Sequence, residues 1–443
     1  MEIRLPEKEI YLCSDNSEIA LMEKLLVFKF GGACLKNVEH IRNAANILKN
    51  FKGQRILLVV SAIDKTTNAL ERVVNSFFAG DSNASGYIEE IKHQHVTLAH
   101  ELGIIDPFAI NEIEDSFIDA IWLLEDEIHD AYEYVYDQVV SIGELVSSRL
   151  VVQFFKNEGL DVQWLDVRDV VKTNEDYKNA TIDWEATQEG ADKIISRAFE
   201  SSEIVVTQGF IGSTRENNTT TLGREGSDYT ASVLAYCLDA ASVHVWKDVE
   251  GIMTGDPKSY EQASLIGELS FDEAIEMCYF GAKVLHPKTI KPIQNKGIPL
   301  YVRPFFNVEN SGTFISDKQD IAYLPIVIKE ENQALVEVGE RDFSFIAENH
   351  LSEIFAILSE LKIKVYIMRN TAISFVFSTK DDELKLQKLE ARLGASYNVK
   401  YRRNLTLLTI RHGSMDDVKK ISGQSQFLFE EVYGETIQVV YQS

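Results

Sequence analysis

Short apolar runs alternate with segments of helical periodicity from about residue 25 to residue 300. The runs lie at Leu25 to Phe30, Arg55 to Ala62, Val162 to Leu165, Ile204 to Thr207 and Ser242 to Trp246. Each has the length of a buried strand. Between them, apolar residues recur three and four positions apart, as on the inner face of a helix. This alternation predicts an α/β domain with a mostly parallel sheet.

The pattern changes between residues 305 and 325. The following segment predicts strands and helices at 326–328, 334–338, 351–361 (helix), 364–368, 373–378 and 382–393 (helix). A second pass predicts them at 405–410, 416–421 (helix), 427–432 and 437–440. The two passes resemble two α+β ferredoxin-like units, so we expect a structural duplication in the tail.

Length and charge limit the classes of function. The chain has 443 residues, enough for about three domains. Its formal net charge of −25 argues against nonspecific binding to nucleic acid or to an anionic membrane. No uncharged apolar run approaches the length of a membrane span, and the first residues lack the apolar region of a signal peptide. Residues 1–21 are expected to be an extension, because Met22 could itself start a compact domain.

The cysteines favour a reduced, cytoplasmic setting. The four, Cys13, Cys34, Cys237 and Cys278, are scattered without a CxxC pair, which fits neither a disulfide framework nor a metal site. The sequence also has no HExxH motif and no Cys/His cluster, so we predict no metal site built from protein ligands alone.

Two glycine-lined turns are candidates for binding an anion. In the first, Ile204 to Thr207 runs into Gly209-Phe210-Ile211-Gly212, and a second turn, Gly223 to Asp228, opens a helix. Ser227 and Asp228 stand where helix N-caps stand, and the free amides of a helix N-terminus suit an anion. Arg224 offers a planar fork for a carboxylate or phosphate. The same residues would equally serve an ordinary capped strand–loop–helix turn.

A further candidate anion-binding turn follows the first strand, where Lys29 precedes Gly31 and Gly32. It is not a Walker A loop, because GxxxxGK[ST] occurs nowhere. A lysine before two glycines is more often a surface residue at the end of a strand. Ser61 to Asn68, Ser141 to Glu144 and Lys247 to Lys258 are further polar turns, which could cap helices or line a ligand site. The charges between 86 and 157 are most simply a solvated face.

Taken together, these segments resemble the aspartokinase family of the amino-acid kinase superfamily. The matching motifs, in order, are KFGG (29–32), the 61–68 turn, SxGE (141–144), TQGFIG (207–212), TTTLGREGSDYTA (219–231), WKDVEGIMTGDPK (246–258) and GAKVLHP (281–287). Each motif is weak alone, but seven in order are specific. The resemblance implies a three-layer αβα sandwich at 22–308, followed by ACT-like domains at 309–399 and 400–443, the second completed by strands from 309–330. No long C-terminal dehydrogenase region is expected, as in monofunctional members.

The resemblance implies transfer of the ATP γ-phosphoryl group to the side-chain carboxylate of L-aspartate, the first step of lysine, threonine and methionine biosynthesis. The implied catalytic residues are Lys29 and Asp228. The residues implied to bind aspartate are Ser61, Thr67, Glu144, Phe210, Arg224 and Ser227. The residues implied to bind ATP with Mg²⁺ are Lys29, Gly31, Gly32, Lys247, Asp248, Gly251, Met253, Asp256, Lys258 and Lys283.

The chain departs from the family pattern at several positions. Ala33-Cys34 replace a common Thr-Ser, Met253 replaces an aromatic residue, and Lys258 replaces an arginine. In the tail, the loop Glu340 to Phe345 lacks the usual glycine, and Tyr366 stands where lysine-sensing members resemble one another in having an acidic residue. Feedback by lysine or threonine is therefore open, and a homodimer through the ACT-like sheets is expected.

Three other functions remain possible at this stage. The chain could be a kinase of the same superfamily that acts on glutamate, acetylglutamate or UMP. It could be a non-catalytic amino-acid sensor on an inactive kinase core, although it retains Lys29, Glu144, Arg224, Asp228 and Lys283. A nicotinamide dehydrogenase ranks last, because no GxGxxG follows any strand.

Overall fold

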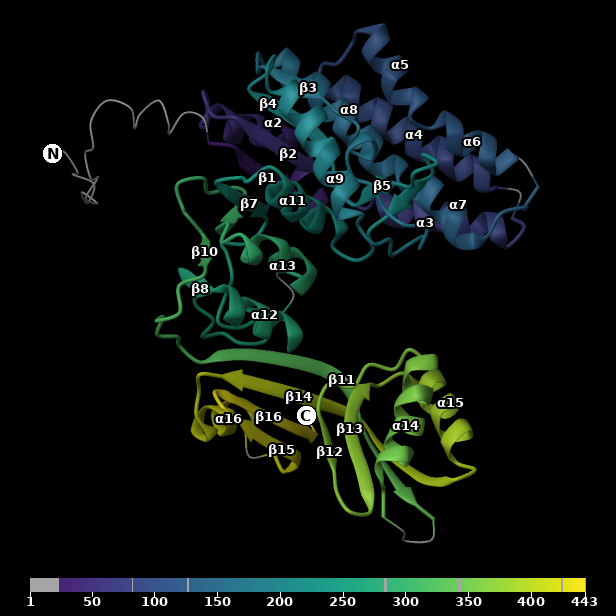
Figure 1. Cartoon of the computed structure of the whole chain (residues 1–443), viewed down its shortest axis with the longest axis vertical. Helices are drawn as coiled ribbons and strands as arrows, with labels where there is room; N and C mark the ends of the chain where they lie inside the picture. The colour runs from purple at the N-terminus through teal and green to yellow at the C-terminus, as the bar shows by residue number, and fades with distance from the viewer. Residues whose placement is uncertain are drawn as a thin grey trace, which may run out of the picture. The chain divides into compact units, whose positions relative to one another are not determined.

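The computed structural model describes residues 24–81, 83–125, 127–282, 285–341, 345–423 and 425–442, which form two compact units (Figure 1). Unit 1 comprises the described residues up to Gly251 with Gly267–Phe271 and Leu285–Lys318. Unit 2 comprises the described residues of Ile252–Ile266, Asp272–Val284 and Gln319–Ser443. The expected extension at residues 1–21 lies outside the described residues.

Unit 1 is built on an eight-stranded sheet in the order β3-β4-β2-β1-β7-β9-β10-β8. Neighbouring strands are parallel except β9 and β10. The strands are β1 (Leu26–Phe30), β2 (Ile56–Val60), β3 (Val162–Trp164), β4 (Ile204–Gln208), β7 (Ser242–Lys247), β8 (Glu268–Ser270), β9 (Leu300–Pro304) and β10 (Thr313–Ser316). Because β1, β2, β4 and β7 run in one direction, the segments that follow them meet at one edge, where α/β sheets bind ligands.

Helices cover both faces of this sheet. They are α2 (Val38–Lys49), α3 (Thr66–Phe78), α4 (Ala84–Glu101), α5 (Pro107–Asp115), α6 (Ile118–Glu125), α7 (Tyr132–Val140), α8 (Ile142–Asn157), α9 (Trp184–Gly190), α10 (Ser196–Ala198), α11 (Gly226–Cys237) and α13 (Pro287–Asn295), with short η1 (Gly32–Leu35), η2 (Val167–Asp169) and η3 (Ala191–Ile195). Helices α3 to α7 gather beside α8 (Figure 1). No helix in the described part of the chain is long and apolar enough to cross a membrane.

Alternation along β1 sends side chains to opposite faces of the sheet. Phe28 and Phe30 are fully buried in a large apolar core that includes Trp246 and residues of α2 and α8. Lys29 therefore points to the other face, where α11 packs on β1. A separate hairpin, β5 (Ile211–Ser213) with β6 (Thr219–Thr221), lies between β4 and α11 in the chain.

Unit 2 holds one six-stranded sheet in the order β12-β13-β11-β14-β16-β15. Its elements are β11 (Ile326–Glu340), α14 (Glu348–Glu360), β12 (Met368–Asn370), β13 (Ser374–Lys380), α15 (Glu383–Leu393), β14 (Tyr397–Arg411), α16 (Met415–Ser422), β15 (Phe427–Tyr433) and β16 (Thr436–Gln442). With the parallel sheet of unit 1, this antiparallel α+β part confirms the fold class expected from the sequence.

The two expected ferredoxin-like passes share their central strands. Residues 326–328 and 334–338 form one strand, β11, which pairs with β14 along its length and changes register after Glu330. Asn332 and Asn404 adopt left-handed backbone conformations at this irregularity. The strand expected at 364–368 is wrong except at its last residue, because β12 begins only at Met368. Before it, Tyr366 and Ile367 exchange backbone hydrogen bonds with Ser378 instead.

The segments that unit 2 takes from the middle of the chain are fixed to its sheet. The amide of Val327 in β11 donates to the carbonyl of Thr254 at 2.7 Å. In helix α12 (Phe271–Tyr279), the buried carboxylate of Glu273 accepts two hydrogen bonds from Arg411 of β14, each 2.6 Å long. These contacts tie residues 252–266 and 272–282 to the six-stranded sheet of unit 2.

Candidate active site

Three charged side chains meet on the face of the sheet that α11 covers. The Lys29 Nζ lies 2.5 Å from Asp228 Oδ1, and the Lys247 Nζ lies 3.4 Å from Asp228 Oδ2. The register explains the meeting, because Lys29 pairs with Val245 of β7, and Lys247 is two residues further along that strand on the same face. Lys29 and Asp228 are buried.

The two ammonium groups keep Asp228 ionised. Burial by itself would raise the pKa of the Asp228 carboxyl, but the charges of Lys29 and Lys247 outweigh burial and hold that pKa below its usual value. The cluster has two positive charges for one negative, so it can attract a further anion.

Helix α11 begins differently from the sequence expectation. Ser227 and Asp228 lie in its first turn, whereas the N-cap is Glu225, in the left-handed conformation at φ 54° and without a side-chain cap. The N-cap positions expected for Ser227 and Asp228 are therefore wrong. Gly226 fits here because a Cβ atom would lie 2.7 Å from the Phe210 ring. The helix starts tightly against Phe210, and the carboxylate of Asp228 reaches the lysines from its first turn.

The glycines after β1 allow close packing. A Cβ atom on Gly32 would lie 2.5 Å from the carbonyl oxygen of Ala62, so the turns after β1 and β2 touch directly. A Cβ atom on Gly31 would lie 3.3 Å from the Lys29 Nζ. The KFGG segment thus places two backbone amides and one buried ammonium at the ligand edge of the sheet.

Glu144 is a buried acid with a free acceptor atom. It lies in the first turn of α8 and is 3% exposed. Its Oε1 accepts a hydrogen bond from the amide of Ala62 at 3.2 Å, whereas its Oε2 has no hydrogen-bond partner among the described residues. Burial raises the pKa of the Glu144 carboxyl to about 8, against the smaller opposing effects of the Ala62 amide and Lys29. A bound ammonium group would supply the missing partner.

The other residues expected to bind aspartate lie on the segments that follow β2 and β4 and on the turn into α11. Ser61 and Thr67 are half-buried, and the carbonyl of Ser61 accepts a hydrogen bond from Ser147 of α8. Phe210 has φ 69°, and its amide donates to Thr230 of α11. Ser227 is buried against Gly209, where a Cβ atom would lie 2.4 Å from the Ser227 Cβ. Arg224 is exposed.

The residues expected to bind ATP fall in both units. Lys247 ends β7, and Asp248 and Gly251 follow it in unit 1. Met253, Asp256 and Lys258 belong to unit 2, where Asp256 Oδ1 accepts a hydrogen bond from the Lys258 amide and both side chains are exposed. Lys283 lies outside the described residues.

The sequence reasoning missed a buried acid in the helical segment. The sequence predicts a solvated face for the charges of residues 86–157, but Asp137 in α7 is 0% exposed, so that prediction is wrong for this residue. Burial raises the pKa of the Asp137 carboxyl to about 6, although hydrogen bonds from Lys178 and Thr221 oppose the shift. Val135, Tyr136, Val139 and Val140 fall on one broad apolar face of the helix, and Asp137 lies beside that face, so the local pattern does not mark this acid as buried.

Comparison with known proteins places this geometry in a family. Residues 24–304 match the model of the amino acid kinase family. The chain is 31% identical to the lysine-sensitive aspartokinase 3 of Escherichia coli, over 92% of this chain and 91% of that protein. It is 34% identical to a bifunctional aspartokinase/homoserine dehydrogenase of Arabidopsis thaliana, over 70% of this chain but only about a third (34%) of the length of that relative.

The fold comparison agrees with the sequence comparison. The crystal structure of E. coli aspartokinase III in complex with aspartate and ADP matches 95% of this chain and 96% of its own, with a TM-score of 0.80 at 29% identity. The likeness thus extends over both units.

Proposed function

The chain belongs to the amino acid kinase family and, within it, to the aspartokinases, and we propose that it transfers the γ-phosphoryl group of ATP to the side-chain carboxylate of L-aspartate, giving 4-phospho-L-aspartate. The observation that carries this proposal is the buried cluster of Lys29, Asp228 and Lys247 at the ligand edge of the sheet. The aspartate-and-ADP complex of the E. coli relative supports both substrates.

The chemistry needs no general base. A carboxylate with a reference pKa near 4 is already ionised at pH 7, so the barrier is the approach of two anions. Catalysis then consists of positioning and of electrostatic stabilisation. Lys29 would contact the transferring phosphoryl group, and the amides of Gly31 and Gly32 would lie beside it. Asp228 would hold Lys29 and Lys247 in place rather than abstract a proton.

Aspartate would be held at both of its ends. The free Oε2 of Glu144 would accept a hydrogen bond from the substrate ammonium, and the fork of Arg224 would bind a carboxylate. Ser61, Thr67, Phe210 and Ser227 would line the same site. Asp248, Gly251, Met253, Asp256, Lys258 and Lys283 would bind ATP.

Magnesium would enter with the nucleotide. No cluster of three or more His, Cys, Asp or Glu residues in the described ranges could hold a metal ion by itself. This fits an ion that keeps several waters and binds mainly to phosphate oxygens. When bound, Mg²⁺ would neutralise phosphate charge. Asp228 would order the cations around it.

An acceptor panel tests the proposed reaction. ADP release is coupled to NADH oxidation with L-aspartate, glutamate, acetylglutamate and UMP as acceptors, and hydroxylamine traps an acyl phosphate as a hydroxamate. Aspartate should give both ADP and hydroxamate. Turnover of another acceptor alone would favour a different kinase of the superfamily, and no Mg·ATP-dependent product with any acceptor would favour a non-catalytic sensor.

We further propose that the tail, with the domain boundaries expected from the sequence, senses an amino acid. The named sensitivity of the E. coli relative supports lysine. However, Tyr366 stands where lysine-sensing relatives have an acidic residue. The Lys364 ammonium lies 4.6 Å from the centroid of the Tyr366 ring, so a cation of the chain itself already occupies that face of the ring. Half of the Glu340 to Phe345 loop, residues 342–344, lies outside the described residues. Unchanged activity on titration with both lysine and threonine would remove this proposal.

A homodimer and a cytoplasmic setting also remain proposals. The six-stranded sheet ends in β12 and β15, and unpaired sheet edges favour pairing with another strand. Light scattering after gel filtration should give twice the chain mass. Cys34 and Cys237, which are buried thiols outside any disulfide, support a reducing compartment.

A further inference from the structure

The β5–β6 hairpin connects two residues that we place against aspartate. Phe210 immediately precedes β5, and Arg224 follows three residues after β6 ends. The amide of Leu222 donates to the carbonyl of Phe210 at 2.8 Å and closes the base of the hairpin. The orientation of the hairpin therefore sets where both residues lie.

Two consecutive side chains of helix α7 are hydrogen-bonded to β6. Asp137 accepts hydrogen bonds from the amide of Thr221 at 2.8 Å and from its hydroxyl at 2.7 Å. Gln138 donates from Nε2 to the carbonyl of Thr219 at 2.8 Å and accepts from the Thr219 amide at 3.3 Å. Both ends of a three-residue strand are thus fixed to one helix.

Asp137 also fixes the loop that packs against the turn before Arg224. Its two oxygens accept hydrogen bonds from the amide of Lys178 at 3.1 and 3.0 Å. The next residue, Asn179, lies so close to Gly223 that a Cβ atom there would be 2.7 Å from its Oδ1. One carboxylate therefore orders β6 and the segment on which the turn rests.

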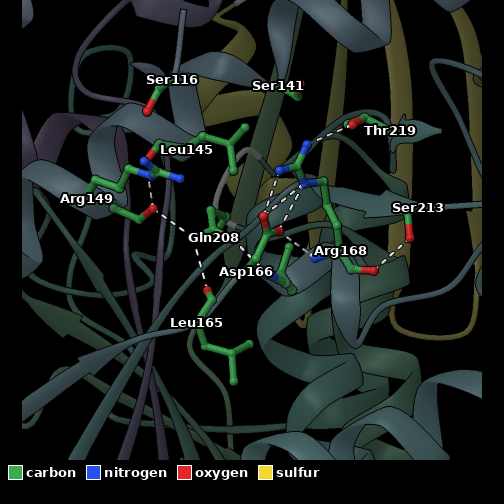
Figure 2. Close-up of polar contacts among 12 residues, drawn as sticks. Ser116, Ser141, Leu145, Arg149, Leu165, Asp166, Arg168, Gln208, Ser213 and Thr219 are labelled. Carbon is green, nitrogen blue, oxygen red and sulfur yellow. Dashed lines mark hydrogen bonds and ion pairs between the residues drawn. The ribbon is translucent and has the colours of Figure 1, made fainter. Parts of the chain in front are cut away.

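Arg168 gives the hairpin a second anchor. Figure 2 shows Arg168, held by Asp166, reaching toward Thr219 and Ser213. The Arg168 guanidinium donates to the Thr219 hydroxyl at 3.1 Å. The backbone carbonyl of Arg168 accepts a hydrogen bond from the Ser213 hydroxyl at 2.7 Å. The hairpin is held on both strands, so loss of Asp137 should shift the turn after β6 rather than release the whole hairpin.

We propose that Asp137 is a positioning residue of the aspartate site, which sets the place of Arg224 by holding Thr221 and the Lys178 loop. It touches no substrate. Every group that contacts the Asp137 carboxylate is an N–H or O–H donor. An asparagine in its place would direct its NH₂ group at some of these donors, and those hydrogen bonds would be lost. The inference rests on the proposed aspartate kinase activity.

The test is Asp137→Asn in the full chain. We expect the KM for L-aspartate to rise about tenfold, the KM for ATP to stay within about twofold, and kcat to fall less than the KM rises. Thr221→Val removes only the hydroxyl donor and should raise the KM for aspartate by a smaller factor, which gives a milder variant if Asp137→Asn folds poorly. Asp106→Asn is the matched control, because Asp106 caps α5 away from the hairpin.

Hydrogen exchange of the peptide that covers 219–224 gives a readout that needs no activity. It should exchange faster in Asp137→Asn than in the control. Faster exchange with an unchanged KM for aspartate, or unchanged exchange in a folded variant, would overturn the positioning role. If the wild type does not phosphorylate aspartate at all, the proposed function fails instead, and the exchange result still tells whether Asp137 orders this turn.

Discussion

Replacing Glu144 by glutamine should remove a pH dependence that we expect of the wild-type enzyme in its reaction with aspartate. In the free enzyme, the pKa of the Glu144 carboxyl is about 8. Because Oε1 accepts from the Ala62 amide, a proton on this carboxyl would lie on Oε2, the atom that we propose accepts from the substrate ammonium. The kcat/KM for aspartate should therefore follow the ionised fraction. That fraction is about one in a hundred at pH 6, about one in ten at pH 7 and about one half at pH 8.

The expected change is therefore large enough to measure. The kcat/KM for aspartate should rise about tenfold between pH 6 and pH 7 and about fivefold between pH 7 and pH 8. In Glu144→Gln this part of the profile should be flat and low, since a neutral amide cannot gain charge. The coupled ADP assay measures it, with aspartate well below its KM and ATP saturating. Glu158→Gln, at the exposed end of the same helix, is the matched control.

Stability gives an independent check of the same group. The folded-state pKa of Glu144 is raised, so the native state holds this proton more tightly than the unfolded chain. Its contribution to the free energy of unfolding therefore falls as the pH rises from about 4.5 to about 8. Glu144→Gln should lose that decline. A wild-type profile for aspartate that is flat between pH 6 and pH 8, or one that Glu144→Gln reproduces, would refute the assignment of Glu144 to the substrate ammonium.

Three further substitutions test other parts of the argument. Lys29→Ala should lower kcat by about 10²-fold or more with little change in the KM for aspartate, because its charge acts in the transition state; the coupled assay would contradict this with the reverse pattern. Arg224→Ala should chiefly raise the KM for aspartate and leave urea unfolding within about 0.5 kcal/mol of the wild type, since Arg224 is exposed. Arg411→Met should lower the free energy of unfolding by about 3 kcal/mol, because it removes two charge-assisted hydrogen bonds from the buried Glu273 carboxylate, which keeps its contact with His412. A second change, Glu273→Gln, should recover part of that loss.

Periodicity predicted the parallel sheet because its strands are short, apolar and separated by helices long enough to cross over. Once β1 and β7 are neighbours, simple alternation accounts for the meeting of Lys29 and Lys247 on one face. The local sequence of a strand does not determine which strand pairs with it, so the pairing of β1 with β7 could not be predicted from either segment. The motifs identify Lys29, Lys247 and Asp228 as candidates, but it is the strand order of the sheet that places both lysines next to Asp228.

The misses have physical causes that act at longer range. The start of α11 depends on how closely Gly226 approaches Phe210, which is sixteen positions earlier, so local capping preference misled the assignment of Ser227. Asp137 looked solvated because its partners, Thr221 and Lys178, are distant in sequence. A buried charge is recognisable in a sequence only where its helix is apolar on all sides.

The passage of the chain between its two units limits how such a protein can change by recombination. The chain passes from one unit to the other five times, because residues 252–266 and 272–284 interrupt unit 1 and belong to unit 2. A tail attached at one point could be exchanged between genes by a single crossover. Here an exchange at residue 319 would give Thr254 and Glu273 a foreign sheet in place of Val327 and Arg411. If the tail senses an effector, as we propose, point substitutions within it would disturb these contacts less than an exchange of the whole tail.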